Sequence, residues 1–513
     1  MTSHTIGIDL GTTYSCVYTC SGGGERLIPA ADGADLTPSV VYFEDDGSVS
    51  VGAEAKSHVQ DDPDNVVVGI KRQMGREFPL QFGNEILTPE GISAVILKRL
   101  AKDASNALNC RTSDLKAVIT VPAYFGVAEK EATHAAARIA GLECLELLAE
   151  PVAAGYAYGA HKDSTTTSLV FDLGGGTFDV AVIGIDQGTP RIWAVDGETR
   201  LGGLDWDARL TDILWEQIEH QSSDSEDLRA DEEFVGELSA AAEQIKRQLS
   251  QSMSAPKTMR YGRQKFSLSV ARGVFEEATR DLVLQCGQSV ERVTAAARTL
   301  GAPHIGRALL VGGSTRMPMI RDYLARSLNL PVEINDPDKA VARGAAVLAE
   351  HLGRPTLINR PSEVERITPV LPRSIGLYIH SSCEPWRPEP YILSALTANT
   401  PLPIAHHEVS VATILHNQER ARIRLYEQGG AVVSERPEDN RLIFDGEVSE
   451  IPQASGGSEI KLLISVGMDG RIAVTARSRK NKPLPMECFI EGVLDDSEVA
   501  RQTQAVAGLI LAD

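Results

Sequence analysis

Two patterns of hydrophobic and polar positions divide the chain. From residue 1 to about 350, short apolar runs alternate with segments whose apolar residues recur at helical spacing, which is typical of an α/β fold. From about residue 370 to 494, polar and apolar positions alternate in short strands separated by turns, which predicts an antiparallel sandwich. The expected strands are Ser374–His380, Tyr391–Leu396, Glu408–Leu415, Ala421–Tyr426, Arg441–Glu447, Glu459–Gly467 and Arg471–Ser478.

These patterns also predict the domain boundaries. A proline-rich stretch with few helical cues separates the two halves and is interpreted as a linker. The last segment predicts one helix, with Asp496 or Ser497 as its N-cap. The expected division is 1–352 for the α/β domain, 353–371 for the linker, 372–494 for the sandwich and 495–513 for a short C-terminal helix.

One short pattern occurs twice. Thr5–Thr13 reads TIGIDLGTT and Leu169–Thr177 reads LVFDLGGGT. Each copy is an apolar strand, an aspartate and a glycine turn with hydroxyl residues, and each is followed by another strand. The two copies indicate a duplicated domain whose two lobes face each other across a cleft.

The repeated turns have the composition of a phosphate-binding site. Glycine lets the backbone approach closely and direct N–H groups at anionic oxygens, and threonine hydroxyls add donors. Asp9 and Asp172 end their strands, where carboxylates can hold a hydrated Mg²⁺. Two ordinary hairpins are the alternative interpretation, which the second copy disfavours. The candidate phosphate-binding residues are Gly11, Thr12, Thr13, Gly174, Gly175, Gly176 and Thr177.

A third glycine turn lies in Leu309–Met317 (LLVGGSTRM), after a strand and before a helix expected near Pro318. Gly312 and Gly313 would let this turn approach a nucleoside, and Arg316 could stack on the base. A plain β–α turn is the alternative interpretation. The segment is not a P-loop, because the GK[ST] element of that motif is missing.

Composition and charge limit the classes of binding partner and the cellular compartment that we expect for this protein. The chain has 513 residues and a formal net charge of −20, which disfavours binding to nucleic acid or an anionic membrane. No apolar run approaches the roughly 18 residues of a membrane span, and no signal peptide is evident. The seven scattered cysteines are typical of buried thiols in a reducing compartment. We therefore expect a cytoplasmic protein.

The sequence resembles the seventy-kilodalton heat-shock chaperone family of the DnaK type. The resemblance covers most of the first 350 residues, and its segments occur in family order. It implies an actin-like, two-lobed ATPase domain followed by a peptide-binding β-sandwich. The matching segments are Ile8–Ser15 (IDLGTTYS), Ile70–Arg76 (IKRQMGR), Val118–Phe125 (VITVPAYF), Ala136–Gly159, Phe171–Val180 (FDLGGGTFDV), Asp196–Asp207 (DGETRLGGLDWD), Ala241–Ser250, Leu309–Ile320 and Asp336–Val347.

The resemblance also implies roles for individual residues. Lys71 matches a lysine beside the γ-phosphate and the attacking water, and Glu150 and Thr199 match residues that orient this water. Asp179 matches a carboxylate in the cation and water network. The implied reaction is slow hydrolysis of ATP, with Mg²⁺ as cofactor and K⁺ as a further candidate. The other implied nucleotide-binding positions are Tyr14, Gly202, Gly203, Glu243, Lys246, Arg247, Ser250, Ser314 and Asp338.

The chain departs from the family pattern in several places. Tyr14 stands where asparagine is usual, and the short stretch Phe78–Thr88 indicates a trimmed first lobe. The linker segment Ser362–Pro372 lacks the leucine run of the family, and no long helical lid is expected after the sandwich. In the sandwich, the match places a peptide pocket at Leu377, Val411 and Ala421, with Ile414 near an arch over the peptide; core packing is the alternative interpretation of each.

The leading hypothesis is an ATP-dependent chaperone-like protein that binds extended or unfolded polypeptide. The resemblance names a J-domain co-chaperone and a nucleotide exchange factor as further candidate partners. The altered linker and missing lid favour a second hypothesis, a nucleotide-sensing scaffold with one dedicated protein partner. A small-molecule kinase of the same superfamily is the third hypothesis.

Overall fold

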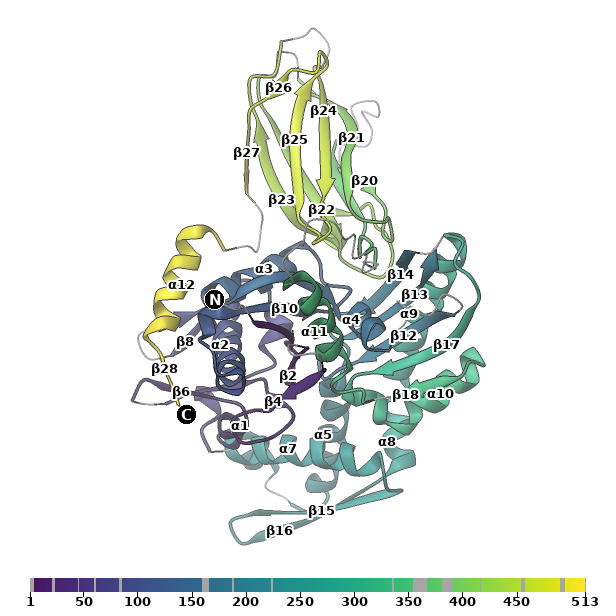
Figure 1. Cartoon of the computed structure of the whole chain (residues 1–513). Coiled ribbons are helices and arrows are strands. Elements are labelled where there is room, and N and C mark those ends of the chain that lie inside the picture. Colours follow the sequence, from purple (N-terminus) through teal and green to yellow (C-terminus); the bar gives the residue numbers. More distant parts are fainter. Residues whose placement is uncertain are drawn as a thin grey trace.

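The computed structural model consists of an α/β body with a β-sandwich standing at one end (Figure 1). None of the described helices is both long and apolar enough to cross a bilayer. Most of the expected linker, residues 354–366, lies outside the described residues. The structure describes residues 4–20, 24–44, 46–59, 61–82, 85–158, 166–186, 189–222, 225–334, 336–353, 367–380, 390–415, 417–453, 457–489 and 494–512.

The body contains two sheets with the same strand order. In each, three strands run antiparallel and two further strands continue in parallel beside the first of them. The first sheet has the order β11 (Glu143–Ala149), β10 (Leu115–Val121), β1 (His4–Asp9), β2 (Tyr14–Thr19) and β3 (Arg26–Ile28), with β4 (Thr37–Pro38) also paired to β2. The second has the order β18 (Val332–Ile334), β17 (Ile305–Val311), β12 (Thr167–Leu173), β13 (Phe178–Asp186) and β14 (Thr189–Glu198). The predicted α/β fold and its duplication are therefore confirmed.

The two sequence repeats occupy equivalent hairpins, β1–β2 in the first lobe and β12–β13 in the second. Smaller sheets and hairpins complete the body: β5 (Val40–Phe43), β6 (Ser48–Val51), β7 (Val66–Val68), β8 (Leu80–Phe82), β9 (Glu85–Leu87), β15 (Ser254–Tyr261) and β16 (Gln264–Ala271). Its helices are α1 (Ala53–Ser57), α2 (Pro89–Leu108), α3 (Val127–Ile139), α4 (Glu150–Ala157), α5 (Gly203–Glu219), α6 (Ser225–Ala230), α7 (Glu232–Leu249), α8 (Arg272–Ala278), α9 (Arg280–Thr299), α10 (Pro318–Leu328) and α11 (Ala340–Gly353).

Helices α4 and α11 join the two lobes. A Cβ on Gly344 of α11 would lie 1.7 Å from the carbonyl oxygen of Ala153 in α4, so only glycine permits this close packing. One buried cluster takes residues from both sheets, among them Val118 of β10, Val170 of β12 and Leu309 of β17. The lobes therefore share a hydrophobic core at the base of the cleft.

The sandwich has two antiparallel sheets, as the strand pattern predicts. One sheet has the order β20 (Tyr391–Leu396), β19 (Ile375–Ile379), β22 (Ala421–Gln428), β23 (Asn440–Val448) and β27 (Met486–Phe489); the other has β21 (Ile404–Ala412), β24 (Glu459–Val466), β25 (Ile472–Ser478) and β26 (Pro483–Leu484). The seven expected strands are present, β20 with the predicted ends and the other six with shifted ends, and the pattern missed β26 and β27. These two are short strands that follow the last predicted hairpin.

The base of the sandwich rests on both lobes. Arg441 of β23 pairs with Glu129 at 2.6 Å and Arg471 pairs with Glu131 at 2.6 Å, and both acids lie on α3. In the second lobe, the backbone N–H of Val195 donates to the Asn399 side chain at 2.8 Å. Val127, the first residue of α3, belongs to the core of the sandwich itself.

The C-terminal segment forms the expected helix, which packs into the first lobe. Helix α12 (Asp496–Gly508) has Asp495 as its N-cap, whose carboxylate accepts from the Glu498 N–H at 2.8 Å, so the expectation of Asp496 or Ser497 was wrong. The helix packs on α2 and α3, and β28 (Ile510–Leu511) pairs in parallel with β6. Gln502 has no exposed surface. Its amide donates to the Ile86 carbonyl at 3.0 Å and accepts from the Thr88 N–H at 3.3 Å.

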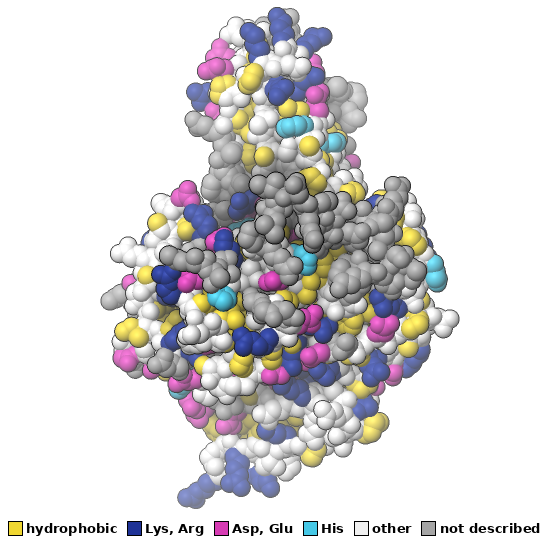
Figure 2. Space-filling model, viewed as in Figure 1, with side chains coloured by type: hydrophobic (Ala, Val, Ile, Leu, Met, Phe, Trp, Pro, Cys, Tyr) yellow, Lys and Arg dark blue, Asp and Glu magenta, His cyan; other side chains and the backbone are white. Residues whose placement is uncertain are grey.

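Surface charge is unevenly distributed. Figure 2 shows acidic and basic side chains interspersed over the middle of the body, whereas Lys and Arg side chains gather at its lower tip. That tip is the β15–β16 hairpin, where Arg260, Arg263 and Lys265 are exposed. The net charge of −20 therefore does not describe every part of the surface.

The described cysteine side chains form no disulfide. Two of them, Cys16 and Cys286, are buried, whereas Cys20, Cys110 and Cys144 are half-buried. The expectation of buried thiols is thus met fully by only two of these residues. Cys383 and the side chain of Cys488 lie outside the described part of the chain.

The place of α12 leads to a stability prediction. Gln502→Ala removes a fully buried side chain and its two part-buried hydrogen bonds, so we expect the free energy of unfolding to fall by about 2 kcal/mol. Urea denaturation followed by circular dichroism measures the change. Gln504→Ala, on the exposed side of the same helix, is the matched control and should stay within about 0.5 kcal/mol of the wild type. Equal stability of the two variants would contradict this assignment of α12.

Candidate functional site

The two repeated glycine turns touch each other where the two lobes meet. A Cβ on Gly175 would lie 1.8 Å from the Thr13 hydroxyl oxygen, and one on Gly176 would lie 2.4 Å from that of Thr12. Threonines of the first turn thus lie directly against glycines of the second. A larger residue at either glycine would force the turns apart.

The second turn is also held by the start of α5 and by the third glycine turn. The N–H groups of Gly203 and Leu204 donate to the carbonyls of Gly174 and Gly175 at 2.9 and 2.8 Å. The Ser314 hydroxyl donates to the Gly174 carbonyl at 2.8 Å. Three glycine segments that are far apart in the sequence therefore form one cluster.

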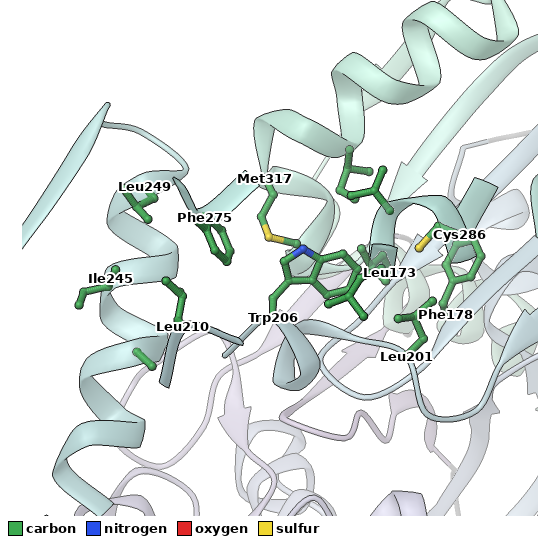
Figure 3. Packing of buried hydrophobic residues seen from close by; sticks show 14 of the residues in the cluster. Leu173, Phe178, Leu201, Trp206, Leu210, Ile245, Leu249, Phe275, Cys286 and Met317 are labelled. Atoms are coloured by element: carbon green, nitrogen blue, oxygen red, sulfur yellow. The ribbon is translucent and has the colours of Figure 1, made fainter. Parts of the chain in front are cut away.

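A hydrophobic cluster beneath these turns keeps them in place. Trp206 is fully buried just after the Gly202-Gly203 pair and lies close to Leu173 and Met317 (Figure 3). Leu173 and Phe178 flank the second glycine turn, and Met317 follows the third. Because one core anchors all three segments, their spacing is set by packing and not by the turns alone.

Lys71 is the buried cation of the site. It lies on a short 3₁₀ helix (Ile70–Gln73) and pairs with Glu150, at the start of α4, with Nζ and Oε1 2.6 Å apart. Both side chains are less than a tenth exposed. Burial disfavours the ammonium, but the charges of Glu150 and Asp9 outweigh it and raise the pKa of Lys71.

Three further carboxyl groups surround this ion pair. Burial, reinforced by the charge of Glu150, raises the pKa of Asp9 to about 7 and that of Asp179 to about 7, and raises the pKa of Asp172 well above its ordinary value. The Thr120 hydroxyl donates to Asp9 at 3.2 Å, and the Tyr124 N–H donates to Asp179 at 2.9 Å. One lysine therefore faces four acids, and the excess negative charge favours an additional cation.

These residues fit a magnesium-bound nucleotide. The acids supply the hard oxygen ligands that Mg²⁺ requires, and the Thr13 hydroxyl is buried with no hydrogen-bond partner. Among the described residues, no three His, Cys, Asp or Glu side chains converge as a complete metal site. Asp9 and Asp172 would thus hold the ion together with water and phosphate oxygens, as is usual for Mg²⁺.

Of the residues expected around the base and ribose, two line one cavity and two others form ion pairs. Lys246 of α7 pairs with Asp207 at 2.6 Å and donates to the Gly203 carbonyl at 2.9 Å. Arg316 pairs with Asp338 at 2.5 Å. Ser250 and Arg316 line the same cavity of about 240 Å³, together with residues of α10.

Thr199 lies half-buried in the turn that follows β14. No contact of the described structure ties it to the acids, so its role stays a prediction. The site includes four residues that the sequence interpretation did not select. Arg72 donates to the Gly176 carbonyl at 2.9 Å and pairs with Asp205 at 2.6 Å, bridging the lobes. Arg72 follows Lys71 directly, and Asp205 and Asp207 follow the Gly202-Gly203 pair. Their position beside residues already selected was therefore the signal in the sequence that could have identified them. Lys56 of α1 lies next to no residue selected from the sequence, so no such signal pointed to it.

The candidate peptide-binding residues do not form one accessible group. Leu377 is fully buried in the core of the sandwich, and Val411 and Ala421 pack against that core from partly buried positions. Of the four, Ile414 alone is largely exposed. Core packing, the alternative interpretation, therefore describes Leu377.

Comparison with known protein families gives one match, to the model described as Hsp70 protein, over residues 5–82 and 79–505. The chain belongs to the Hsp70 family. Hsp70 proteins are ATPases, with an actin-like ATPase domain and a β-sandwich substrate-binding domain. The family binds ATP with magnesium and typically binds polypeptides and co-chaperones. In this Hsp70 member, the described helix after the sandwich packs on the first lobe and forms no long lid.

The contact between the two turns leads to a binding prediction. Gly176→Ala introduces a Cβ that cannot coexist with Thr12, so we expect the affinity for magnesium-bound ADP to fall at least about tenfold, or about 1.4 kcal/mol. Calorimetric titration measures the affinity. Gly273→Ala, in α8 of the same lobe with nothing near the added Cβ, is the control and should bind like the wild type. Unchanged affinity in Gly176→Ala would show that the turns do not enclose the phosphates.

Proposed function

We propose that this Hsp70 member hydrolyses ATP slowly and uses the reaction to control the binding of extended polypeptide by its sandwich. The observation that carries the proposal is a line of contacts from the acids of the cleft to the sandwich. The Tyr124 N–H donates to Asp179, and the guanidinium of Arg373 lies 4.5 Å from the centre of the Tyr124 ring. Arg373 pairs with Glu427 of β22 at 3.4 Å.

The groups of the cleft suit hydrolysis. Lys71 fixes the Glu150 carboxylate, which can then accept a hydrogen bond from the attacking water. A magnesium-bound ATP would supply the transferable phosphoryl group and a divalent charge to balance Asp9 and Asp172. The glycine turns would hold the phosphates by close backbone approach, so catalysis would consist of positioning and electrostatic stabilisation.

The junction with the sandwich is built from buried charge, which supports coupling between the domains. Arg373 and Glu427 are almost completely buried, and Glu427 also accepts from the Val127 N–H at 3.4 Å. Burial raises the pKa of Glu427. A buried pair of this kind tolerates little misalignment, because separating its members leaves an uncompensated charge. A shift of Asp179 or Tyr124 would therefore be transmitted to β22.

The position of α12 bears on how firmly a peptide would be held. The described helix that follows the sandwich packs on the first lobe and leaves the sandwich uncovered. Without a cover, bound peptide would dissociate quickly, and affinity differences would lie mainly in the dissociation rate.

A second candidate function is a nucleotide-sensing scaffold with one dedicated protein partner. It is favoured by the burial of Leu377 and by the firm attachment of the sandwich to both lobes. Capture of a single folded partner, with no binding of unfolded chains, would support this alternative.

The proposed function requires that polypeptide and ATP each affect the other, and measuring both effects tests it. We expect unfolded polypeptide to change the ATP turnover, and ATP to change the peptide affinity relative to ADP by a factor of about 5 to 150. Fluorescence anisotropy of a labelled peptide and a phosphate-release assay measure the two effects. Glu427→Gln should reduce the ATP effect at least severalfold, because it removes the charge that pairs with Arg373.

Asp445→Asn is the matched control for this experiment. Asp445 pairs with Arg422 at 2.5 Å on the solvent side of the same two strands, so its loss should leave the linkage intact. If neither ligand affects the other in the wild type, the chaperone function is excluded and the scaffold remains.

The role of Lys71 gives a kinetic prediction. Lys71→Met leaves Glu150 without its cation, and we expect single-turnover hydrolysis of ATP to slow by about 100-fold or more. Quenched-flow measurement of bound ATP gives the rate. Lys116→Met, which removes a solvent-exposed pair with Glu143 in the same lobe, should hydrolyse ATP at the wild-type rate. A rate in Lys71→Met close to the wild type would rule Lys71 out as a catalytic residue.

A further inference from the structure

The end of the sandwich that points away from the body carries a group of basic side chains. Four of the six residues from 477 to 482 are Lys or Arg and none is acidic, although the whole chain has a formal net charge of −20. They lie at the end of β25 and in the turn before β26, and Figure 2 shows Lys and Arg side chains gathered at this end. We call four side chains the distal basic rim: Arg477, Arg479, Lys480 and Lys482.

Most of the rim is not neutralised by the protein itself. All four of its residues are exposed. Arg479 pairs with Glu459 of β24 at 3.6 Å. Within the described part of the chain, no ion pair involves Arg477, Lys480 or Lys482. Three cations at this end are therefore available to a ligand.

The strand register places one cation of the rim directly opposite another cation. Arg477 of β25 faces Lys461 of β24 in the antiparallel ladder. Side chains in such a pair project from one face of the sheet with Cβ atoms about 5 Å apart, and like charges there destabilise the pairing. Glu408 of β21 pairs with Lys461 at 2.9 Å and so balances one of the two charges. An acidic group bound from outside would balance the other.

Two exposed aliphatic side chains lie at the same end. Ile414 and Leu415 follow β21, and they are 55% and 67% exposed. The Thr413 N–H donates to the Ser458 carbonyl at 3.0 Å, which ties their turn to the start of β24. Within the turn, the Leu415 N–H donates to Gln418 Oε1 at 3.1 Å. Exposed apolar surface bordered by charged groups is typical of an interaction site.

The spacing of the strands relates the aliphatic pair to the rim. Strands β21, β24 and β25 are neighbours in one sheet, so the ends of β21 and β25 lie two strand spacings, or about 10 Å, apart. An extended polypeptide advances about 3.3 Å per residue, so about three residues span this distance. A chain that crosses the end of the sheet would thus place an apolar side chain on Ile414 or Leu415 and a side chain three positions away at the rim.

We propose that the distal basic rim selects extended polypeptides in which acidic residues lie about three positions from an aliphatic or aromatic residue. The inference rests on the proposed binding of polypeptide by the sandwich, and it specifies the class of chain that is bound. An anionic membrane fits this end less well, because three carboxylates at the same end would be repelled by a continuous negative surface, whereas a single chain can pass between them. These acids are Glu419, Glu447 and Glu459.

The test compares three labelled peptides that share one apolar residue and carry acidic, neutral or basic flanking residues. We expect the full chain at low salt to bind the acidic peptide about tenfold more tightly than the neutral one, and the basic peptide least tightly. Fluorescence anisotropy measures the three affinities. Added salt should reduce the preference, because exposed charges are screened.

Two double variants assign the preference to the rim. Lys480→Gln with Lys482→Gln should lower the preference for the acidic over the neutral peptide by about threefold and leave the affinity for the neutral peptide unchanged. Arg263→Gln with Lys265→Gln removes the same charge from the exposed β15–β16 hairpin at the other end of the molecule, and it should bind all three peptides like the wild type. All four positions are exposed, so neither variant should disturb folding.

A third variant tests the apolar contact separately from the charge. Ile414→Ser should weaken the binding of all three peptides by the same factor, because it removes apolar surface and no charge. If Ile414→Ser weakens none of them, the aliphatic pair is not part of the site, and the inference is wrong.

The outcomes separate the inference from the function on which it rests. If the neutral peptide binds in an ATP-dependent manner but the acidic peptide binds no more tightly, the rim is wrong and the proposed function stands. If both double variants reduce the preference equally, it reflects the charge of the whole chain, which also overturns the rim. An acidic preference without any effect of ATP supports the rim and contradicts the proposed coupling.

The remaining outcomes concern the class of ligand. Binding to vesicles of phosphatidylcholine with phosphatidylserine, together with no preference for the acidic peptide, would assign the rim to a membrane and overturn the inference. If the wild type binds none of the three peptides, both the inference and the proposed function fail.

Discussion

The buried ion pair between Lys71 and Glu150 is the constraint around which the body is built. Removing charges from water is costly, and a buried pair often adds no net stability compared with apolar residues of similar size. Asp9, Asp172 and Asp179 lie in the same low-polarity space, and burial raises the pKa of each because it disfavours the charged carboxylate. Such a cluster persists only because the surrounding fold encloses it. Its composition is therefore better explained by binding and chemistry than by stability.

Enclosing this cluster requires the two lobes to meet closely at defined points. The glycine turns permit the approach, and the cluster around Trp206 holds three glycine segments at fixed spacing (Figure 3). At the base of the cleft, α4 and α11 pack through Gly344 and share a core with both sheets. Beside the second glycine turn, the lobes are also joined by charged groups, including the pair of Arg72 with Asp205. The lobes are thus held together by apolar packing at one place and by polar contacts at another.

The sandwich is connected to the body at both of its chain ends. Before it, the Ile192 N–H of β14 donates to the Thr368 carbonyl at 3.0 Å, which ties the incoming chain to the second lobe. After it, α12 enters the core of the first lobe through Val499 and Val506. The chain that enters the sandwich is thereby attached to the second lobe, and the chain that leaves it is attached to the first lobe (Figure 1). Any change in the relative position of the lobes would therefore act on both attachments.

Local patterns in the sequence determined much of this protein. The strand alternation predicted the sandwich, and the repeated Asp-Gly turns predicted the duplicated lobes and the position of the glycine turns, because these features depend on neighbouring residues alone. Arg72 and Asp205 lie beside residues that the sequence assigned to the site, so they could have been predicted as site residues too. The tertiary structure decided the rest. Gln502 contacts Thr88, 414 positions earlier, and Tyr14 meets Arg247, 233 positions later. No periodicity encodes such pairs, since they depend on surfaces that become complementary only once distant segments have packed together.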